Sequence, residues 1–212
     1  MTVRVNKPAV NLREELASLR NQGGYSEQQF YFDGLITNGT FDTDTDWTKG
    51  TGWTIGSGVA TCDGSVTSDV LYQSHATTSG ASYIITFEIT AFTSGAIIAR
   101  AGNVRSTDVK NTVGVHSATV IADGQPFLGI EAENTFVGSI DNVSVFELDA
   151  NGDVTHTMPK GWKPKDVFEH GLLQREGAAN DYEVVYDGFD YKVKPTVAPT
   201  ATTETCVIGV KA

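Results

Sequence analysis

The sequence predicts an all-β protein: an antiparallel β-sandwich with an N-terminal helical arm and a small C-terminal β module. The 22 glycines and the frequent Thr, Ser and Val residues favour short strands joined by turns. Between residues 59 and 148, short segments that alternate apolar and polar residues recur at regular spacing, which is typical of a sandwich. The stretches 35–55 and 136–148 predict the first and last strands of that sandwich.

Length and charge narrow the classes of function. A chain of 212 residues suits one sandwich and one smaller module. The net charge of −11 argues against nucleic acid as a partner, because Lys and Arg supply most of the affinity for phosphates. No apolar run reaches the roughly 20 residues of a membrane span, and the leader lacks the apolar segment of a secretory signal. We therefore expect neither membrane insertion nor export by a signal peptide.

Residues 1–34 predict an anchor arm with a short helix. Asn11 is placed to cap the first helical amides, and Glu14 completes a capping box. A helix of about ten residues needs a surface to lie on, since isolated helices need ~12–15 residues. That surface is either this chain's own sandwich or a partner protein, and we favour the partner. The predicted docking residues are Arg4, Lys7, Leu12, Leu16 and Leu19.

The sandwich is predicted to span residues 35–149. Its alternation is clearest where Tyr83, Ile85, Phe87 and Ile89 are separated by more polar positions, as a half-buried strand requires. The predicted strands after the opening stretch are residues 59–62, 70–74, 83–91, 96–101, 112–121, 127–132 and 140–148.

Residues 150–164 predict a linker, and residues 165–212 a small β module. Strands are expected at 167–168, 182–186, 189–194 and 205–210, with a hairpin turn at Asp187-Gly188. So short a module has a thin core, and we expect it to lean on the sandwich or on copies of itself. Cys62 and Cys206 fall in different modules, so two reduced thiols are favoured over a disulfide that ties the modules together.

The sandwich resembles a known family. Asn38-Gly-Thr-Phe-Asp42, Trp47 and Trp53, closed by residues 140–145 (Ile-Asp-Asn-Val-Ser-Val), resemble the galactose-binding-like jelly-roll domains of carbohydrate-binding modules, over residues 35–148. The resemblance implies a jelly-roll and a structural calcium ion held by Asp42 and Asp141, with Thr40 as a carbonyl donor. The alternative is that Asp141 only accepts hydrogen bonds from backbone amides.

The same resemblance raises the question of a glycan ligand. Sugar binding needs exposed aromatic rings, and the candidates are Trp47, Trp53, Tyr72 and Tyr83. In a small sandwich such rings more often belong to the core. Both interpretations stay open at this point.

The two ends of the chain resemble segments of tailed-bacteriophage proteins. Residues 171–177 (Gly-Leu-Leu-Gln-Arg-Glu-Gly), Asp181-Tyr182 and Ala198-Pro199 are similar to a small β module of phage fibres, with residues 178–180 inserted. Residues 7–16 look like the start of tailed-phage structural proteins. Together these features imply a protein of the virion surface, made in the host bacterial cytoplasm. The implied partners are other virion proteins, copies of this chain with a trimer favoured, and host-surface glycan.

Motifs of catalysis do not occur in the sequence. There is no Gly-x-Ser-x-Gly elbow, no His-Glu-x-x-His pair and no Walker loop, and the four histidines lack ligand spacing. Asp44 and Asp46 fit a solvated loop better than a glycosidase pair. We therefore expect a structural protein without enzymatic activity, with capsid decoration favoured over a tail-fibre or adaptor role. The alternative is a carbohydrate-binding module that contacts host glycan. A secreted adhesin is disfavoured by the missing signal.

Overall fold

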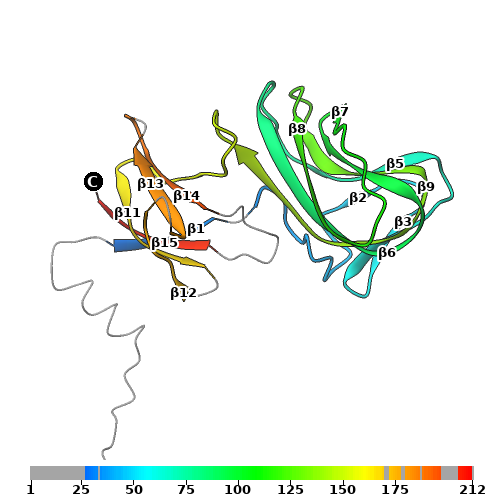
Figure 1. Cartoon of the computed structure of the whole chain (residues 1–212), viewed down its shortest axis with the longest axis horizontal. Helices are drawn as coiled ribbons and strands as arrows, with labels where there is room; N and C mark the ends of the chain where they lie inside the picture. Colours follow the sequence, from blue (N-terminus) through cyan, green and yellow to red (C-terminus); the bar gives the residue numbers. More distant parts are fainter. Residues whose placement is uncertain are drawn as a thin grey trace, which may run out of the picture.

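The computed structural model describes residues 27–32, 34–169, 172–177, 180–186, 188–196 and 205–211. These residues form an all-β structure of antiparallel sheets, as the sequence predicts. A large module holds one eight-stranded sheet, and a small module holds one four-stranded and one three-stranded sheet (Figure 1). The predicted arm helix, with Arg4, Lys7, Leu12, Leu16 and Leu19, lies outside the described residues.

The large module contains strands β2 to β9. Two of them, β6 and β9, are much longer than the rest and pair with each other along most of their length. The bounds are β2 (Thr48–Lys49), β3 (Trp53–Gly56), β4 (Val59–Asp63), β5 (Ser68–Ser74), β6 (Ser82–Ala101), β7 (Val104–Arg105), β8 (Gly114–Ile121) and β9 (Phe127–Leu148).

Strands β6 and β9 each replace two strands of the prediction. The residues between the predicted halves read as turns in the sequence, but they are bends within continuous strands. In β6 the pairing register shifts around Phe92 and Ser94, and Gly95 has a φ of +77°. In β9 the facing bend has positive φ at Asn134 and Thr135. A side chain at position 95 would lie 2.4 Å from the Phe136 backbone, so glycine is required there.

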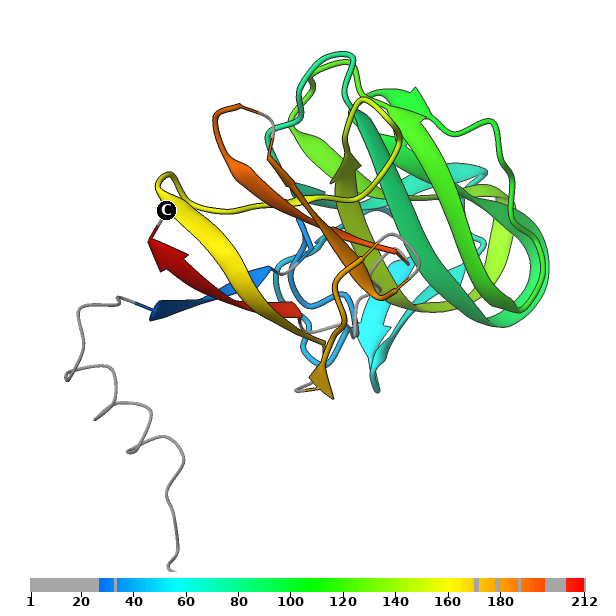
Figure 2. The ribbon, with the colours of Figure 1, turned by 60° about the vertical axis from the view of Figure 1, so that its left-hand side comes forward.

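The bends fold the sheet onto itself. The first half of β6 lies between β8 and the last part of β9, and its second half pairs with the first part of β9. That part of β9 also pairs with β5, and β5 with β2. Strand β4 pairs with the middle of β9 on one side and with β3 on the other. The sheet curls in this way until it nearly closes into a barrel (Figures 1 and 2).

The opening segment of the large module lies beside its closing strand. The Leu35 amide donates a hydrogen bond to the Val145 carbonyl oxygen at 2.8 Å, and the Val143 amide donates to the Gly39 oxygen at 2.8 Å. The predicted regular strand at the start of residues 35–55 is wrong, because the backbone has positive φ at Asn38 and reaches its first strand only at β2. The opening segment therefore lies beside the closing strand as expected, but it is not itself a strand.

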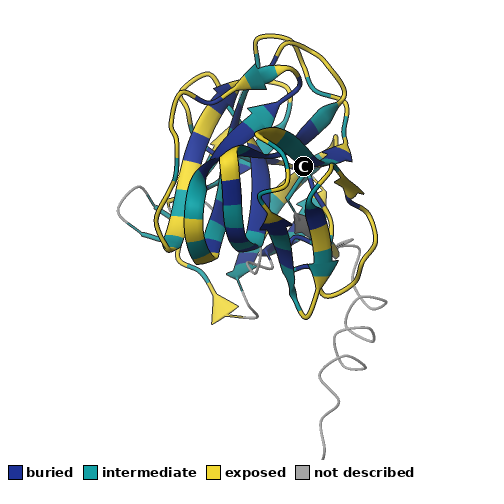
Figure 3. Ribbon diagram, turned by 90° about the vertical axis from the view of Figure 1, so that its right-hand side faces the viewer, coloured by how far each residue is buried: buried dark blue, intermediate teal, exposed yellow. Residues whose placement is uncertain are grey.

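The core of the large module follows the predicted alternation. Tyr83, Ile85, Phe87 and Ile89 are all buried, while the positions between them are only partly so. Figure 3 shows the same alternation of buried and less buried residues along neighbouring strands. Cys62 is buried in this core and Cys206 lies on a strand of the small module, and no disulfide joins the two.

The small module is assembled from segments far apart in the sequence. Its four-stranded sheet has the order β1-β15-β11-β12 and its three-stranded sheet the order β10-β14-β13. It has a separate small core. The bounds are β1 (Glu27–Phe32), β10 (His156–Thr157), β11 (Trp162–Glu169), β12 (Leu172–Leu173), β13 (Tyr182–Tyr186), β14 (Tyr191–Pro195) and β15 (Thr205–Lys211). The core residues are Met158, Val167, Tyr182, Val193 and Val207.

Strand β1 belongs to the small module, although the sequence division counts residues 27–32 with the arm. It pairs antiparallel with β15, from Glu27 opposite Val210 to Phe32 opposite Thr205. Strand β10 and the start of β11 likewise come from the stretch expected to be a linker. Sequence alone could not reveal the pairing of β1 with β15, because the whole large module separates these two strands in the sequence.

The two modules meet around His156. This side chain is only 6% exposed, and its ring lies edge-on to the Phe146 ring of β9 with centroids 6.1 Å apart. Nearby, a bridge joins Leu148 to Val154, and Lys194 forms an ion pair with Asp153 at 2.6 Å. The junction is therefore packed as well as connected by the chain.

Because His156 is buried, we expect the protein to be less stable in mild acid. Burial lowers the pKa of His156 from 6.5 to about 4. Between these two pH values the unfolded chain binds a proton that the folded protein does not, so stability falls as the pH drops through this window. The full loss is about 3 kcal/mol. Urea unfolding from pH 7 to 4 measures it, and His156→Gln is expected to remove this part of the pH dependence.

His75→Gln is the matched control, because His75 lies in the loop after β5 and is less buried than His156. It should keep the wild-type pH dependence. Equal slopes for wild type and His156→Gln would contradict the assignment.

Candidate functional site

The first candidate site lies where the loop of residues 38–42 meets β9. The Thr40 hydroxyl donates to Asp42 Oδ2 at 2.8 Å. On β9, the Asn142 amide donates to Asp141 Oδ1 at 2.6 Å, and the Asn142 side chain donates to Glu88 Oε2 at 2.9 Å. Glu88 stands on β6 opposite Asp141 in the strand register. The structure thus brings Asp42 and Asp141 to one place, as expected, and adds Glu88.

The electrostatics of this acidic cluster are shown by Asp141. Partial burial raises the pKa of Asp141, and the negative charges of Glu88 and Asp42 raise it further. The hydrogen bond from the Asn142 amide acts in the opposite direction. Sequence reasoning missed Glu88, because its position on the strand is visible but its cross-strand partner is not.

The donor set suits a hard cation only in part. Asp42, Asp141 and the Thr40 oxygens are the oxygen ligands that calcium takes. Among the residues that the structure describes, however, no group of three or more His, Cys, Asp or Glu side chains is arranged to hold a metal ion. The alternative role, in which Asp141 accepts a backbone amide, is seen in its bond with Asn142. Calcium at Asp42 and Asp141 stays a prediction.

The predicted glycan platform is largely buried. Trp47 and Trp53 both belong to the core of the large module, and so does Tyr83. The Trp47 indole donates to the Asn38 oxygen at 2.9 Å and its ring packs on Phe41. The Trp53 ring stacks on Phe136 with centroids 6.3 Å apart. In this structure these three rings serve the core and offer no free face to a sugar.

Tyr72 is the remaining aromatic candidate, and it lies on the outward face of β5. Its ring is 5.3 Å from that of Phe127, and the Arg100 guanidinium lies 5.5 Å from the centroid of the Phe127 ring. Both Tyr72 and Arg100 are opposite Gly129 in the strand register, and Gly129 has no side chain to separate them. We call these four residues the aromatic-arginine face.

A buried carboxylate holds the arginine of this face in place. Glu131, two residues beyond Gly129 on β9, is buried, and its Oε2 lies 3.1 Å from Arg100 Nη1 and 3.2 Å from Arg105 Nε. The Ser68 hydroxyl donates to its other oxygen. Arg100 also donates to the Asn103 oxygen at 2.9 Å. An arginine whose two terminal nitrogens are both hydrogen-bonded, beside the Phe127 ring, can hydrogen-bond and stack on a planar or cyclic polar ligand.

Sequence reasoning missed Arg100, Phe127 and Glu131. Each sits at an outward position of an alternating strand, which the sequence shows. Which of these strands lie side by side depends on the long β6 and β9 pairing, which the sequence does not show.

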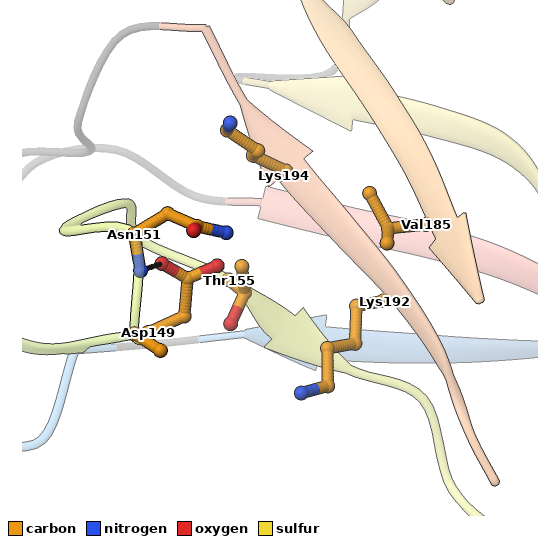
Figure 4. Close-up of a pocket in the computed structure, with 7 residues that line it drawn as sticks. Asp149, Asn151, Thr155, Val185, Lys192 and Lys194 are labelled. Atoms are coloured by element: carbon orange, nitrogen blue, oxygen red, sulfur yellow. Dashed lines mark hydrogen bonds between the residues drawn. The ribbon is translucent and has the colours of Figure 1, made fainter. Parts of the chain in front are cut away.

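A shallow pocket lies at the module junction (Figure 4). The Asn151 amide donates to Asp149 Oδ1 at 2.8 Å. Although burial acts to raise it, the pKa of Asp149 is lowered by backbone amides and by the nearby lysines. Lys194 of its lining forms an ion pair with Asp153, and we assign the pocket a structural role. Its lining residues are Asp149, Ala150, Asn151, Thr155, Val185, Lys192 and Lys194.

In the described part of the chain, no helix has the length and apolar character needed to cross a membrane. No family model matches the sequence, and no curated protein is significantly similar to it.

Proposed function

We propose that this protein is a structural component of a tailed-phage particle without enzymatic activity, anchored by its N-terminal arm and displayed on the capsid or tail surface. The observation that carries the proposal is the position of β1. It follows the predicted arm directly in the sequence and pairs with β15, so the described chain begins in the small module (Figure 1). Such an arrangement suits attachment at one module and display of the other.

The surface of the small module supports an attachment role. Several large apolar side chains are exposed there, and Phe189 at the β13-β14 turn is 87% exposed. Exposed apolar side chains in a module with so small a core favour contact with other proteins. They fit neighbouring virion proteins or further copies of this chain, for which a trimer is favoured. The other exposed side chains are Leu172, Leu173, Val185 and Tyr186.

The large module suits display. Its jelly-roll assignment is supported by the opening segment that lies along the closing strand, through the Leu35 and Val143 hydrogen bonds. Capsid decoration is favoured over a tail-fibre role, because the sequence lacks the long fibrous repeat that a fibre needs.

Removal of residues 1–24 is expected to abolish incorporation without unfolding the protein. The deletion ends before β1, so both sheets of the small module keep all their strands. Incorporation is measured as copies per particle, by densitometry of purified virions or by cryo-electron microscopy. A matched variant with Leu12, Leu16 and Leu19 changed to serine tests the apolar face alone. Full occupancy by the truncated chain would refute the anchor.

A second candidate function is binding of host-surface glycan, favoured by the aromatic-arginine face. Tyr72 and Phe127 supply ring surfaces and Arg100 supplies fixed hydrogen-bond donors. This combination is the usual chemistry of sugar recognition, in which rings stack on the pyranose and polar groups bond its hydroxyls. The predicted test is loss of retention on immobilised host glycan in Tyr72→Ala.

A further inference from the structure

We propose that β8 is a dimerisation edge, at which a second copy of this chain adds its own β8 antiparallel across a two-fold axis. This contact lies on the large module and does not depend on the proposed function.

The first step is that β8 has a free edge. It pairs with β6 from Gly114 opposite Ile89 to Ile121 opposite Ser82, and no other described strand pairs with it. An edge strand presents a row of backbone amides and carbonyls on its open side, ready to bond another strand.

The second step is that β8 lacks the features that normally protect an edge. Natural edges carry charged side chains, prolines or bulges that stop another strand from pairing. The eight residues of β8 include no Asp, Glu, Lys, Arg or Pro, and their pairing with β6 has no register shift. On the outward face, Val115 is 68% exposed and Ile121 is 58% exposed. The edge is uncharged in a protein whose net charge is −11.

The third step identifies the partner as a second copy. In antiparallel self-pairing, each residue must face one of the same parity, because successive residues direct their backbone groups to opposite edges. Pairing about Ala118 satisfies this rule and places Val115 opposite Ile121 of the second copy. The same register places Ser117 opposite Thr119. Apolar side chains then meet apolar ones and hydroxyls meet hydroxyls, so the strand is complementary to itself, as a two-fold contact requires.

Charge further favours this edge. Two copies that each carry −11 repel one another over most of their surfaces. An uncharged strand with two exposed apolar residues is a place where close approach leaves no like charges directly opposed. Cross-strand apolar pairs then add to the main-chain hydrogen bonds.

The test uses the full chain and sedimentation velocity. Wild type is expected to sediment with an even number of copies. The variant Ser117→Lys/Thr119→Lys places introduced lysines directly opposite each other twice in the proposed register, and its mass is expected to fall twofold. Both positions are exposed in the single copy, so circular dichroism should show an unchanged fold.

A charge-swapped variant tests the register. In Ser117→Lys/Thr119→Glu, each introduced lysine faces an introduced glutamate, so the wild-type mass is expected to return. In a register shifted by one pair, about Ser117 itself, the two introduced lysines face each other and the mass stays halved. A monomeric wild type, a double-lysine variant of unchanged mass, or a charge-swapped variant that fails to reassociate would each overturn the proposal.

Discussion

Replacing Trp53 with alanine is expected to lower the free energy of unfolding by about 3–5 kcal/mol. The side chain is only 4% exposed, and its ring stacks on the fully buried Phe136. Its indole also donates to the Asp69 oxygen at 3.3 Å, which ties the start of β3 to β5. Removal leaves a cavity that the surrounding strands cannot fill, because β9 is held by neighbours on both sides. Urea unfolding followed by circular dichroism measures the change.

Tyr72→Ala is the matched control for Trp53→Ala. Tyr72 is only partly buried on the outward face, so a loss of about 1 kcal/mol is expected. The two variants also separate the functions of the rings. If glycan is a ligand, Tyr72→Ala should lose retention on the immobilised glycan while it stays folded. Unchanged melting with lost retention in Trp53→Ala would show instead that the Trp53 ring reaches the ligand.

Glu131→Ala is expected to cost about 3–5 kcal/mol, which is comparable to the loss of a core tryptophan. The Glu131 carboxylate is almost fully buried and is the shared partner of Arg100 and Arg105. Without it, the Arg100 side chain, itself only 16% exposed, is left charged in the sheet without its main partner. The penalty is the uncompensated charge, more than the lost attraction. Thermal and urea unfolding at neutral pH measure it.

Glu133→Ala provides the control on the same strand and face. Its ion pair with Arg105 is more exposed to solvent, with a quarter of the Glu133 side chain accessible. Surface pairs of this kind contribute about 1 kcal/mol or less. A similar loss in both variants would show that Glu131 is not the centre of the network.

The sequence predicts the strands well and their connections poorly. Alternation sets which residues of β6 face inward, and Tyr83, Ile85 and Phe87 are buried as expected. The bends contain glycine and asparagine, which are the residue types that usually indicate turns. The sequence therefore predicts four short strands in place of the long strands β6 and β9. Only tertiary pairing shows that β6 continues as one bent strand through Gly95. The pairing of β1 with β15 is invisible for the same reason.

The sequence likewise predicts some residues of the candidate sites and misses others. The resemblance to jelly-roll carbohydrate-binding modules implies that Asp42 and Asp141 lie together, and in the structure the two carboxylates are close enough for the charge of Asp42 to raise the pKa of Asp141. The sequence left Trp47 and Trp53 open between core and platform, although core positions are the more common ones for such rings, and only the structure places both in the core. Arg100 and Glu131 form their ion pair only because the second half of β6 pairs with the first part of β9. The arm residues lie outside the described part of the chain.

The pairing of β1 with β15 has a consequence for biosynthesis. As the ribosome releases the chain, β1 emerges early and has no strand to pair with until β15, close to the other end of the sequence, has followed it. The large module, whose strands are all translated in between, can fold first as a unit. A nascent chain that stops before β15 would then carry a finished large module and an unfinished small one.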